Sequence, residues 1–478
     1  MNRVNLTQSN YNTFGTTPTI LVVNTDVTIG TGSVSFADGC VFEFAGGIIK
    51  SGGSSNGTIT GSVSVVSNYG LVQLFDHVNV PDLVNRDVPI EWFGGKCYAN
   101  SPGSSPTLSD QAIANAVLAH RDRKIMFQPG YYVFSQSVTI SRSGITLSGT
   151  KSCSMQWNGF RQSATDGRNS VSALKYTGSS NTSLFNITCD GIRMENLLLL
   201  GSNTHTAVIL SGNCVNVFAD RCMFHGWKKG IYKSGTSSGL SRCIIDNCVF
   251  NYIKETAIEA NVGYVTCNMI RDSWFHYCGN PIRLVSTSHL LQDNSIDNCN
   301  FDFVIYDSTL YSTYGCCAIY LESQTANRNY ATNNISRCYF ERICYDPDTN
   351  PPSWATNTAA VICKDTSITI DNNFFTSTPR YFIIDSCSSI SIGDNGIGIN
   401  YSEASTYPLQ HDTLVYVIPS SVNKSIRQSI LYSNSIPIST DSGCSFITKL
   451  VSFAQGAGTN FSVRNLYETR FTDYAHLL

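Results

Sequence analysis

Charged residues are scarce in this chain of 478 residues, where Asp, Glu, Lys and Arg together make up 14%, against roughly 25% in ordinary domains. The formal net charge is −3, so the sequence lacks the basic stripe that binds nucleic acid, and we expect no nucleic-acid partner. No apolar run approaches 18 residues, so we expect no membrane span. The start, Met1 to Gln8, has no apolar signal core. These absences favour a protein that is made and assembled in a cytoplasm.

What the chain has instead is a repeat. Seven copies of one short pattern lie between residues 193 and 375, each with an aliphatic residue, a polar pair, a small residue and then a large apolar one. The copies end at Leu198, Phe224, Phe250, Phe275, Phe301, Phe340 and Phe375, in steps of 26, 26, 25, 26, 39 and 35 residues. A period near 26, carried by β-branched and aromatic residues, predicts an all-β solenoid.

Each copy predicts how one coil is built. If the Phe faces inward, the Cys or Asn two residues earlier faces inward too, because alternate side chains of a strand share a face. The aliphatic residue five before the Phe can also face inward only if the Asp-Asn or Asp-Arg pair forms a bend. A second inward stretch follows, as in Ala257-Ile258 and Pro281-Ile282. Stacked at roughly 4.8 Å, like residues then lie over like.

The 18 cysteines suggest a disulfide scaffold until they are placed on this repeat. Cys222, Cys248, Cys299 and Cys338 fall in the inward column, where a free thiol acts as a small apolar residue. Stacked thiols could also be paired, but we favour free thiols, as expected in a reducing compartment.

Helical spacing of apolar residues occurs in one segment. Thr107-Leu-Ser-Asp110 resembles a capping box, and Ala112, Ile113, Ala116 and Val117 follow at helical spacing. We predict one helix near 107–121, used as a cap over the open end of the solenoid.

The chain therefore divides into four expected regions. Residues 1–17 are polar and are either frayed or a docking peptide, and residues 18–88 form a small N-terminal β-coil region. The main solenoid spans 89–400, and 401–478 form a β-rich cap or a binding or trimerisation module.

The coil also predicts which residues face outward beside each inward Phe. Just before it come Met223, Val249, Trp274, Asn300, Tyr339 and Phe374, and just after it come His225, Asn251, His276, Asp302, Glu341 and Thr376. Asp302 and Glu341, one coil apart, would have carboxyl groups roughly 5 Å apart, near the range of glycosidase pairs. Two such carboxyls suit an acid and a base or nucleophile. We take Asp302, Glu341 and His276 as catalytic candidates.

The same two strands open the longest insertions, residues 303–316 and 342–358, which we expect to form groove walls. Aromatic residues suit sugar rings, so the substrate-binding candidates are Trp274, Tyr339, Tyr306 and Trp354. An outward apolar column is equally typical of a packing face in a three-fold assembly. The cysteines near His225 and His276 face inward and form no Cys-x-x-Cys pair, so we expect no metal and no cofactor.

Four segments resemble a known family: Glu91-Trp-Phe-Gly-Gly95, Asp110-Gln-Ala-Ile113, Phe127-Gln-Pro-Gly-Tyr131 and Ile145-Thr-Leu-Ser-Gly149. They are similar to the entry segment of the pectate-lyase-like right-handed parallel β-helix family, which many bacteriophage tail spikes share. One departure is Ser101 to Ser109, which stands where the family usually has an acidic run.

The resemblance implies a homotrimeric virion spike that recognises, and often depolymerises, a host surface polysaccharide, and that is attached to other tail proteins. A virion tail protein assembled in the host cytoplasm needs no export signal, which agrees with the start of the chain. Two alternatives stay open: a non-catalytic structural or adhesive virion protein, and a bacterial polysaccharide lyase or hydrolase.

Overall fold

The structure is a computed structural model that resolves into two units, residues 1–207 with 217–223 (unit 1) and residues 208–216 with 224–478 (unit 2). The described residues are 1–67, 72–99, 103–118, 123–150, 171–212, 215–288, 291–305, 315–324, 332–345, 358–376, 378, 381–385, 387, 389–393, 395–398, 413–418, 428–433, 449–453 and 461–465. Within these residues, no helix is long and apolar enough to cross a membrane.

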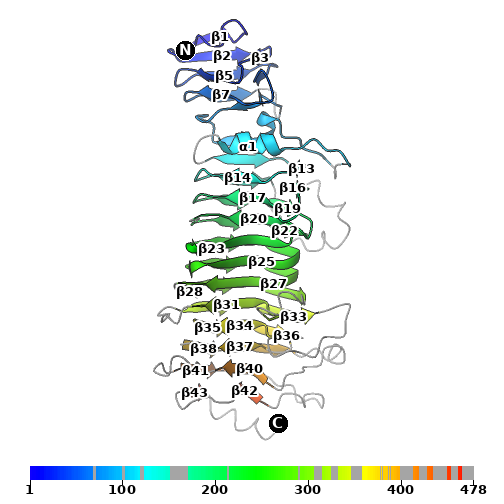
Figure 1. Cartoon of the computed structure of the whole chain (residues 1–478), viewed down its shortest axis with the longest axis vertical. Coiled ribbons are helices and arrows are strands. Elements are labelled where there is room, and N and C mark those ends of the chain that lie inside the picture. Colours follow the sequence, from blue (N-terminus) through cyan, green and yellow to red (C-terminus); the bar gives the residue numbers. More distant parts are fainter. Residues whose placement is uncertain are drawn as a thin grey trace. The chain divides into compact units, whose positions relative to one another are not determined.

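Unit 1 begins with a coil of three short parallel sheets (Figure 1). Their strands, in sheet order, are β1 (Asn2–Asn5), β2 (Thr19–Val23), β5 (Val41–Phe44) and β8 (Ser64–Ser67); β10 (Val78–Asn79), β7 (Gly57–Thr60) and β4 (Ser33–Ser35); and β3 (Val27–Thr28), β6 (Ile49–Lys50) and β9 (Phe75–Asp76). Phe42, Phe44 and Phe75 fill its interior at 0–1% exposure. Residues 2–5, which belong to the segment 1–17 expected to be either frayed or a docking peptide, pair in parallel register with β2.

The entry segment of unit 1 carries the expected helix. Helix α1 runs from Asp110 to Leu118, after the 3₁₀ turn η1 (Ile90–Phe93). The four apolar residues at helical spacing, Ala112, Ile113, Ala116 and Val117, are buried, but the capping box is wrong. The Asp110 carboxylate accepts hydrogen bonds from Ser135 and from the Gln136 backbone N–H at 2.8–3.2 Å, and the Thr107 N–H donates to Tyr98 at 2.6 Å. Asp110 therefore holds the turn after β13 (Gly130–Phe134).

Two longer parallel sheets complete unit 1. One has the order β11 (Asp87–Pro89), β12 (Lys124–Phe127), β15 (Thr146–Gly149), β18 (Arg193–Glu195) and β21 (Phe218–Asp220), and the other contains β13, β14 (Val138–Ile140), β16 (Ser172–Tyr176), β17 (Ser183–Ile187) and β19 (Leu197–Leu200). Met194 pairs with Ala219, so the first repeat step is 25 residues and not the 26 expected from Leu198. Strand β20 (Thr206–Leu210) and strand β22 (Met223–His225) lie at the division between the units.

Unit 2 is built from the same kind of coil. One sheet has the order β24 (Ile244–Asp246), β26 (Met269–Arg271), β29 (Ser295–Asp297), β32 (Asn333–Ser336), β35 (Ser367–Asp371), β38 (Ser389–Gly393), β41 (Gln428–Ser433) and β43 (Phe461–Asn465). The other contains β23 (Lys229–Ser241), β25 (Val249–Thr266), β27 (Trp274–Ser286), β28 (Leu291–Gln292), β30 (Asn300–Ile305), β31 (Ile319–Ser323), β33 (Tyr339–Tyr345), β34 (Val361–Lys364), β36 (Phe374–Thr376), β37 (Phe382–Asp385), β39 (Gly396–Gly398), β40 (Thr413–Ile418) and β42 (Lys449–Phe453). Like residues pair in parallel from coil to coil, as Ile270 does with Ile296 and Ile296 with Ile335. The chain folds as the right-handed parallel β-helix that the sequence predicts.

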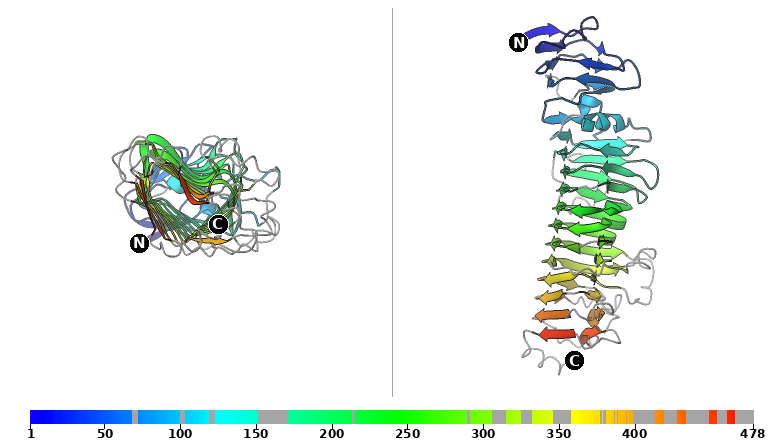
Figure 2. Two further views of the ribbon diagram at one scale, coloured as in Figure 1. Left: turned by 90° about the horizontal axis from the view of Figure 1, so that it is seen from below. Right: turned by 60° about the vertical axis from the view of Figure 1, so that its left-hand side comes forward.

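The inward Phe column of unit 2 is confirmed. Phe224, Phe250, Phe275, Phe301, Phe340 and Phe375 are each 0% exposed. Their rings stack on their neighbours with centroids 4.6–5.0 Å apart. The superposed strands of this unit are visible from two further directions in Figure 2. Burying each ring contributes roughly 1.5–3 kcal/mol.

The polar pair of each repeat forms the predicted bend. Its second residue has a left-handed backbone in every copy, with φ between 49° and 57° at Asn196, Arg221, Asn247, Asp272, Asn298, Arg337 and Asn372. Asn and Asp accept this conformation at low cost. The bend lets the aliphatic residue and the Phe point to the same interior.

One cysteine pair departs from the expectation of free thiols. Cys316 and Cys344 form a disulfide with a Cα–Cα distance of 5.7 Å. The repeat could not predict it, because Cys316 ends the first insertion and Cys344 lies in the second, so both are outside the repeated pattern. The four cysteines of the inward column are free and buried.

The described strands beyond residue 400 continue the coil. Phe382 pairs with Val415 and Ile390 with Ile430, both in parallel register. The expected boundary at residue 400 is therefore not marked by a break in these sheets.

Candidate functional site

The structure brings the predicted outward residues of unit 2 into two adjacent columns. His276, Asp302 and Glu341 are register partners on β27, β30 and β33. Trp274, Asn300 and Tyr339 are partners on the same three strands. Register partners in neighbouring parallel strands are roughly 4.8 Å apart, so Asp302 and Glu341 lie side by side as expected.

Exposure along these columns differs from the prediction. Met223 and Val249, expected on the surface, are only 2% and 6% exposed, whereas Phe374 is 42% exposed. His276 is 4% and Asp302 8% exposed, and Glu341 is half-buried. The strand period sets the side to which a side chain points, but the packing around it sets how much water it meets.

His276 is held against Asp302. Its Nδ1 lies 3.1 Å from Asp302 Oδ2, and the rings of Tyr277 and Phe303 meet the imidazole edge-on, with centroids 4.4 and 5.5 Å away. The other carboxyl oxygen, Asp302 Oδ1, is buried and has no hydrogen-bond partner in the described part of the chain. A buried acceptor without a donor is costly and is common where a ligand binds. His276 therefore orients Asp302 through one carboxyl oxygen, and the other oxygen lies buried without a donor among the described residues.

Glu341 has a different set of partners. The Tyr339 hydroxyl donates to Glu341 Oε2 at 3.2 Å, and Arg342 Nη1 lies 3.5 Å from Glu341 Oε1. Burial, with the negative charge of Glu341, raises the pKa of Tyr339 to about 12. Tyr339 is therefore a proton donor over the physiological pH range, and it stabilises the carboxylate form of Glu341 together with Arg342.

A ladder of aromatic residues, which was not predicted from the sequence, occupies the position two residues after the inward Phe. Tyr252, Tyr277 and Phe303 stack with centroids 5.0 and 4.8 Å apart, and the Arg342 guanidinium lies 4.4 Å from the Phe303 centroid. All four have left-handed backbones, with φ of 50–54°. A non-glycine residue with a left-handed backbone raises the free energy of the folded state by about 1–3 kcal/mol, and such residues cluster at functional sites. The signal was an aromatic two residues after the inward Phe in three consecutive copies.

The substrate-binding candidates are only partly brought together. Trp274 and Tyr339 are half-buried in one column, separated by Asn300, and Tyr339 stacks on Phe374 at 5.7 Å. Tyr306 and Trp354 lie outside the described residues. The insertions that hold them leave β30 and β33, the strands of Asp302 and Glu341.

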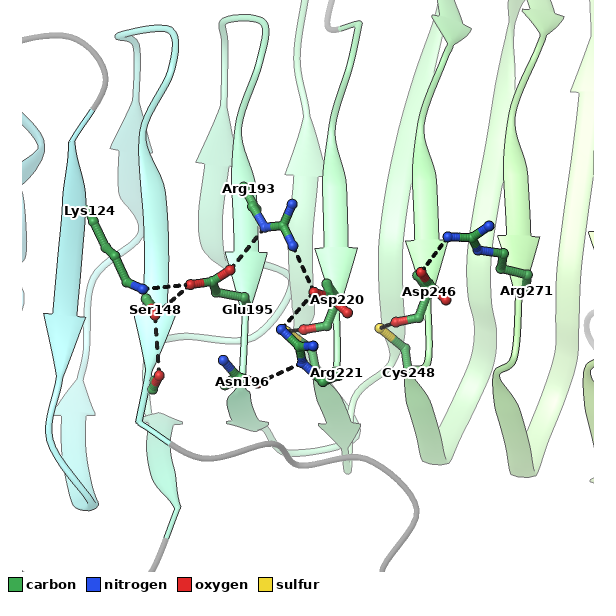
Figure 3. A network of polar contacts seen from close by, with 12 residues as sticks. Lys124, Ser148, Arg193, Glu195, Asn196, Asp220, Arg221, Asp246, Cys248 and Arg271 are labelled. Carbon is green, nitrogen blue, oxygen red and sulfur yellow. Dashed lines mark hydrogen bonds and ion pairs between the residues drawn. The ribbon is translucent and has the colours of Figure 1, made fainter.

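A second set of carboxylates, in unit 1, is fully paired (Figure 3). Glu195 bonds to Lys124 at 2.9 Å and to Arg193 at 3.0 Å, and Arg193 also bonds to Asp220 at 2.7 Å. Burial acts to raise the pKa of Glu195, but the hydrogen bonds from Lys124 and Ser148 outweigh it and lower the pKa. Cationic side chains of the same sheet therefore balance the charges of both carboxylates.

Metal binding has no support from the geometry. Among the described residues, no group of three or more His, Cys, Asp or Glu side chains is arranged to hold a metal ion.

No family model and no curated protein matches this sequence. The solved structures that it resembles include the catalytic unit of a GH87 α-1,3-glucanase from Streptomyces thermodiastaticus, at 12% identity over 79% of this chain and 68% of that one, with a TM-score of 0.41. The A-module of a mannuronan C-5 epimerase from Azotobacter vinelandii matches at 10% identity over 79% and 100%, with a TM-score of 0.40. The Dettilon tailspike protein matches at 13% identity over 80% and 68%, with a TM-score of 0.39. A tail spike and polysaccharide-modifying enzymes are thus among the structural neighbours of this chain.

Proposed function

We propose that this chain is a bacteriophage tail spike protein that binds a host surface polysaccharide. We further propose that the carboxyl groups of Asp302 and Glu341 cleave this polysaccharide. The observation that supports the proposal is the adjacent register of these two residues, one of which has a buried oxygen with no hydrogen-bond partner among the described residues. Two carboxyl groups on either side of the scissile bond, roughly 5–9.5 Å apart, are typical of enzymes that cleave glycosides. The aromatic ladder beside them suits the apolar faces of sugar rings.

The two carboxyls have separate roles in this proposal. Glu341, supported by Tyr339 and Arg342, is the ionised group and acts as base or nucleophile. Asp302 shares a hydrogen bond with His276 and supplies the proton that the leaving sugar oxygen takes up. His276 is a positioning residue, because its ring is nearly covered and reaches the substrate only through Asp302.

The test is Glu341→Gln in the full chain. We expect loss of cleavage by about 10²–10⁴-fold, read as new reducing ends or as absorbance of unsaturated sugars after incubation with host capsule. Glu43→Gln is the matched control, because Glu43 bonds to Arg3 at the surface of unit 1. Unchanged cleavage by a folded Glu341→Gln protein would retire the site.

A non-catalytic adhesive or structural virion protein is the second candidate. The burial of His276 and Asp302, together with the exposed Phe374 stacked on Tyr339, favours it. It predicts retention of the polysaccharide on immobilised protein with no new reducing ends. Both the catalytic and the non-catalytic virion protein would be homotrimers in the virion tail with other tail proteins as partners. Light scattering of the purified chain tests the trimer. A bacterial lyase or hydrolase would show the same cleavage, and neighbouring genes would identify it.

A further inference from the structure

Unit 1 has a cleft of about 460 Å³ beside the segment from Glu91 to Cys97, within the roughly 300–1,000 Å³ of small-molecule sites. Gln73, Glu91, Lys96, Cys97 and Gln128 line it, together with two glycines. All of these residues belong to unit 1.

The carboxyl of Glu91 is the unusual group in this cleft. Glu91 is 7% exposed, and its Oε1 accepts a hydrogen bond from the hydroxyl of Tyr132, which is 0% exposed. That hydroxyl in turn accepts the Gln128 N–H at 2.8 Å. The second oxygen, Glu91 Oε2, is buried and has no hydrogen-bond partner among the described residues. The carboxyl is thus held rigidly with one acceptor unmet, a deficit that a ligand's donor would remove.

The charges around Glu91 decide what kind of donor fits. Burial raises the pKa of Glu91, against hydrogen bonds from Tyr132 and from its own backbone N–H, which lower it. The Lys96 ammonium lines the same cleft, and both facts disfavour a cationic ligand. The carboxamides of Gln73 and Gln128 are half-buried and each offers donors and acceptors. The set matches a neutral ligand rich in hydroxyl groups.

We propose that this cleft binds a neutral sugar unit, with one hydroxyl donating to Glu91 Oε2 and another bonded to the Gln128 carboxamide. The proposal does not rest on the function assigned to Asp302 and Glu341. A chain without cleavage activity would still bind a sugar here, and an active chain could lack this site.

Cys97 provides a local readout, because its half-buried thiol lines the cleft, while the free thiol of Cys267 is exposed elsewhere. The experiment measures iodoacetamide labelling of both cysteines by peptide mass spectrometry, with glucose, galactose or mannose at millimolar concentration. We expect one of these hexoses to slow labelling of Cys97 and to leave Cys267 unchanged. Protection by methylammonium or guanidinium chloride instead would show a cation site and overturn the proposal, as would protection by neither.

Two variants locate the contact. Glu91→Gln keeps an oxygen for Tyr132 but replaces the free acceptor by a donor, and Gln128→Ala removes the carboxamide at the edge of the cleft. Each variant should weaken the binding of the protecting hexose by about tenfold, as expected for the loss of one hydrogen bond to a buried group. The matched control is Gln136→Ala, because Gln136 is exposed and lies outside the cleft. In this variant the hexose should protect Cys97 as well as it does in the unmodified protein. Full protection in both Glu91→Gln and Gln128→Ala would refute the site, and circular dichroism checks that each variant is folded.

Discussion

The carboxylates of unit 1 and those of the candidate site in unit 2 occupy the same kind of position, on successive strands of a parallel sheet. In unit 1, Glu195 and Asp220 are each held by cationic side chains, so their charges are matched within the sheet. In unit 2, Asp302 bonds to His276, and its other oxygen is buried with no hydrogen-bond partner within the part of the chain that the structure describes. The difference teaches that a β-helix satisfies its structural carboxylates locally, and that an unsatisfied one marks a place for something else.

The sharpest test of this comparison is Asp302→Asn against Asp297→Asn. Asp297 lies in the same unit but is paired with Arg337 and Ser336, much as Glu195 and Asp220 of unit 1 are paired with cationic side chains. We expect Asp302→Asn to lower polysaccharide cleavage by about 10²–10⁴-fold and Asp297→Asn to leave it unchanged. Equal losses in initial-rate assays would mean that the unpaired oxygen has no special role.

The next largest effect separates inward from outward aromatics. Phe301→Ala empties a 0% exposed position of the Phe column and should lower the free energy of unfolding by about 3–5 kcal/mol. Phe374→Ala, at 42% exposure, should lower it by less than about 0.5 kcal/mol. Urea unfolding followed by fluorescence measures both, and a large loss in Phe374→Ala would instead point to a subunit interface.

A smaller effect is expected in the aromatic ladder. Tyr277→Asn keeps a residue that tolerates the left-handed backbone but removes the ring, so polysaccharide binding should weaken by about 0.5–1.5 kcal/mol. Asn372→Gly is the control, because Asn372 has the same backbone and is a bend residue of the repeat. Calorimetric titration of both proteins with host polysaccharide tests this. A ladder that only stabilises the fold would leave the affinity of Tyr277→Asn unchanged.

The smallest effect contrasts two carboxylates through pH. Burial, then the charge of Asp385, raises the pKa of Asp365 to about 6 from 3.8, so its contribution to stability is present at low pH and is lost as pH rises through about 6. Asp365→Asn should therefore raise the melting temperature at pH 8 and leave it unchanged near pH 4.

Asp297 should behave in the opposite way. The hydrogen bond from Arg337 lowers the pKa of Asp297, so its stabilising contribution is present above pH 3.8 and is lost as pH falls further. Asp297→Asn should lower the melting temperature at pH 8 and have no effect at the lowest pH that the fold tolerates. If the melting temperatures of Asp365→Asn and Asp297→Asn changed with pH in the same way, neighbouring groups would not determine the pKa values of these carboxylates.

Much of the candidate site could be predicted from the repeat. The register partners His276, Asp302 and Glu341 follow from counting along identical coils, because parallel strands pair like residue with like. The aromatic ladder was open to the same counting. The disulfide between Cys316 and Cys344 was not, because both cysteines belong to the insertions and have no counterpart in the repeated pattern.

The sequence by itself determined the coil, its interior and the bends, since a period of two within strands and a left-handed residue between them leave one way to bury each Phe. Only the tertiary structure decided which outward residues meet water, which carboxylates find a cation and where a cleft remains at Glu91. These properties depend on side chains brought together from separate rungs and turns, whose distances the local pattern does not encode.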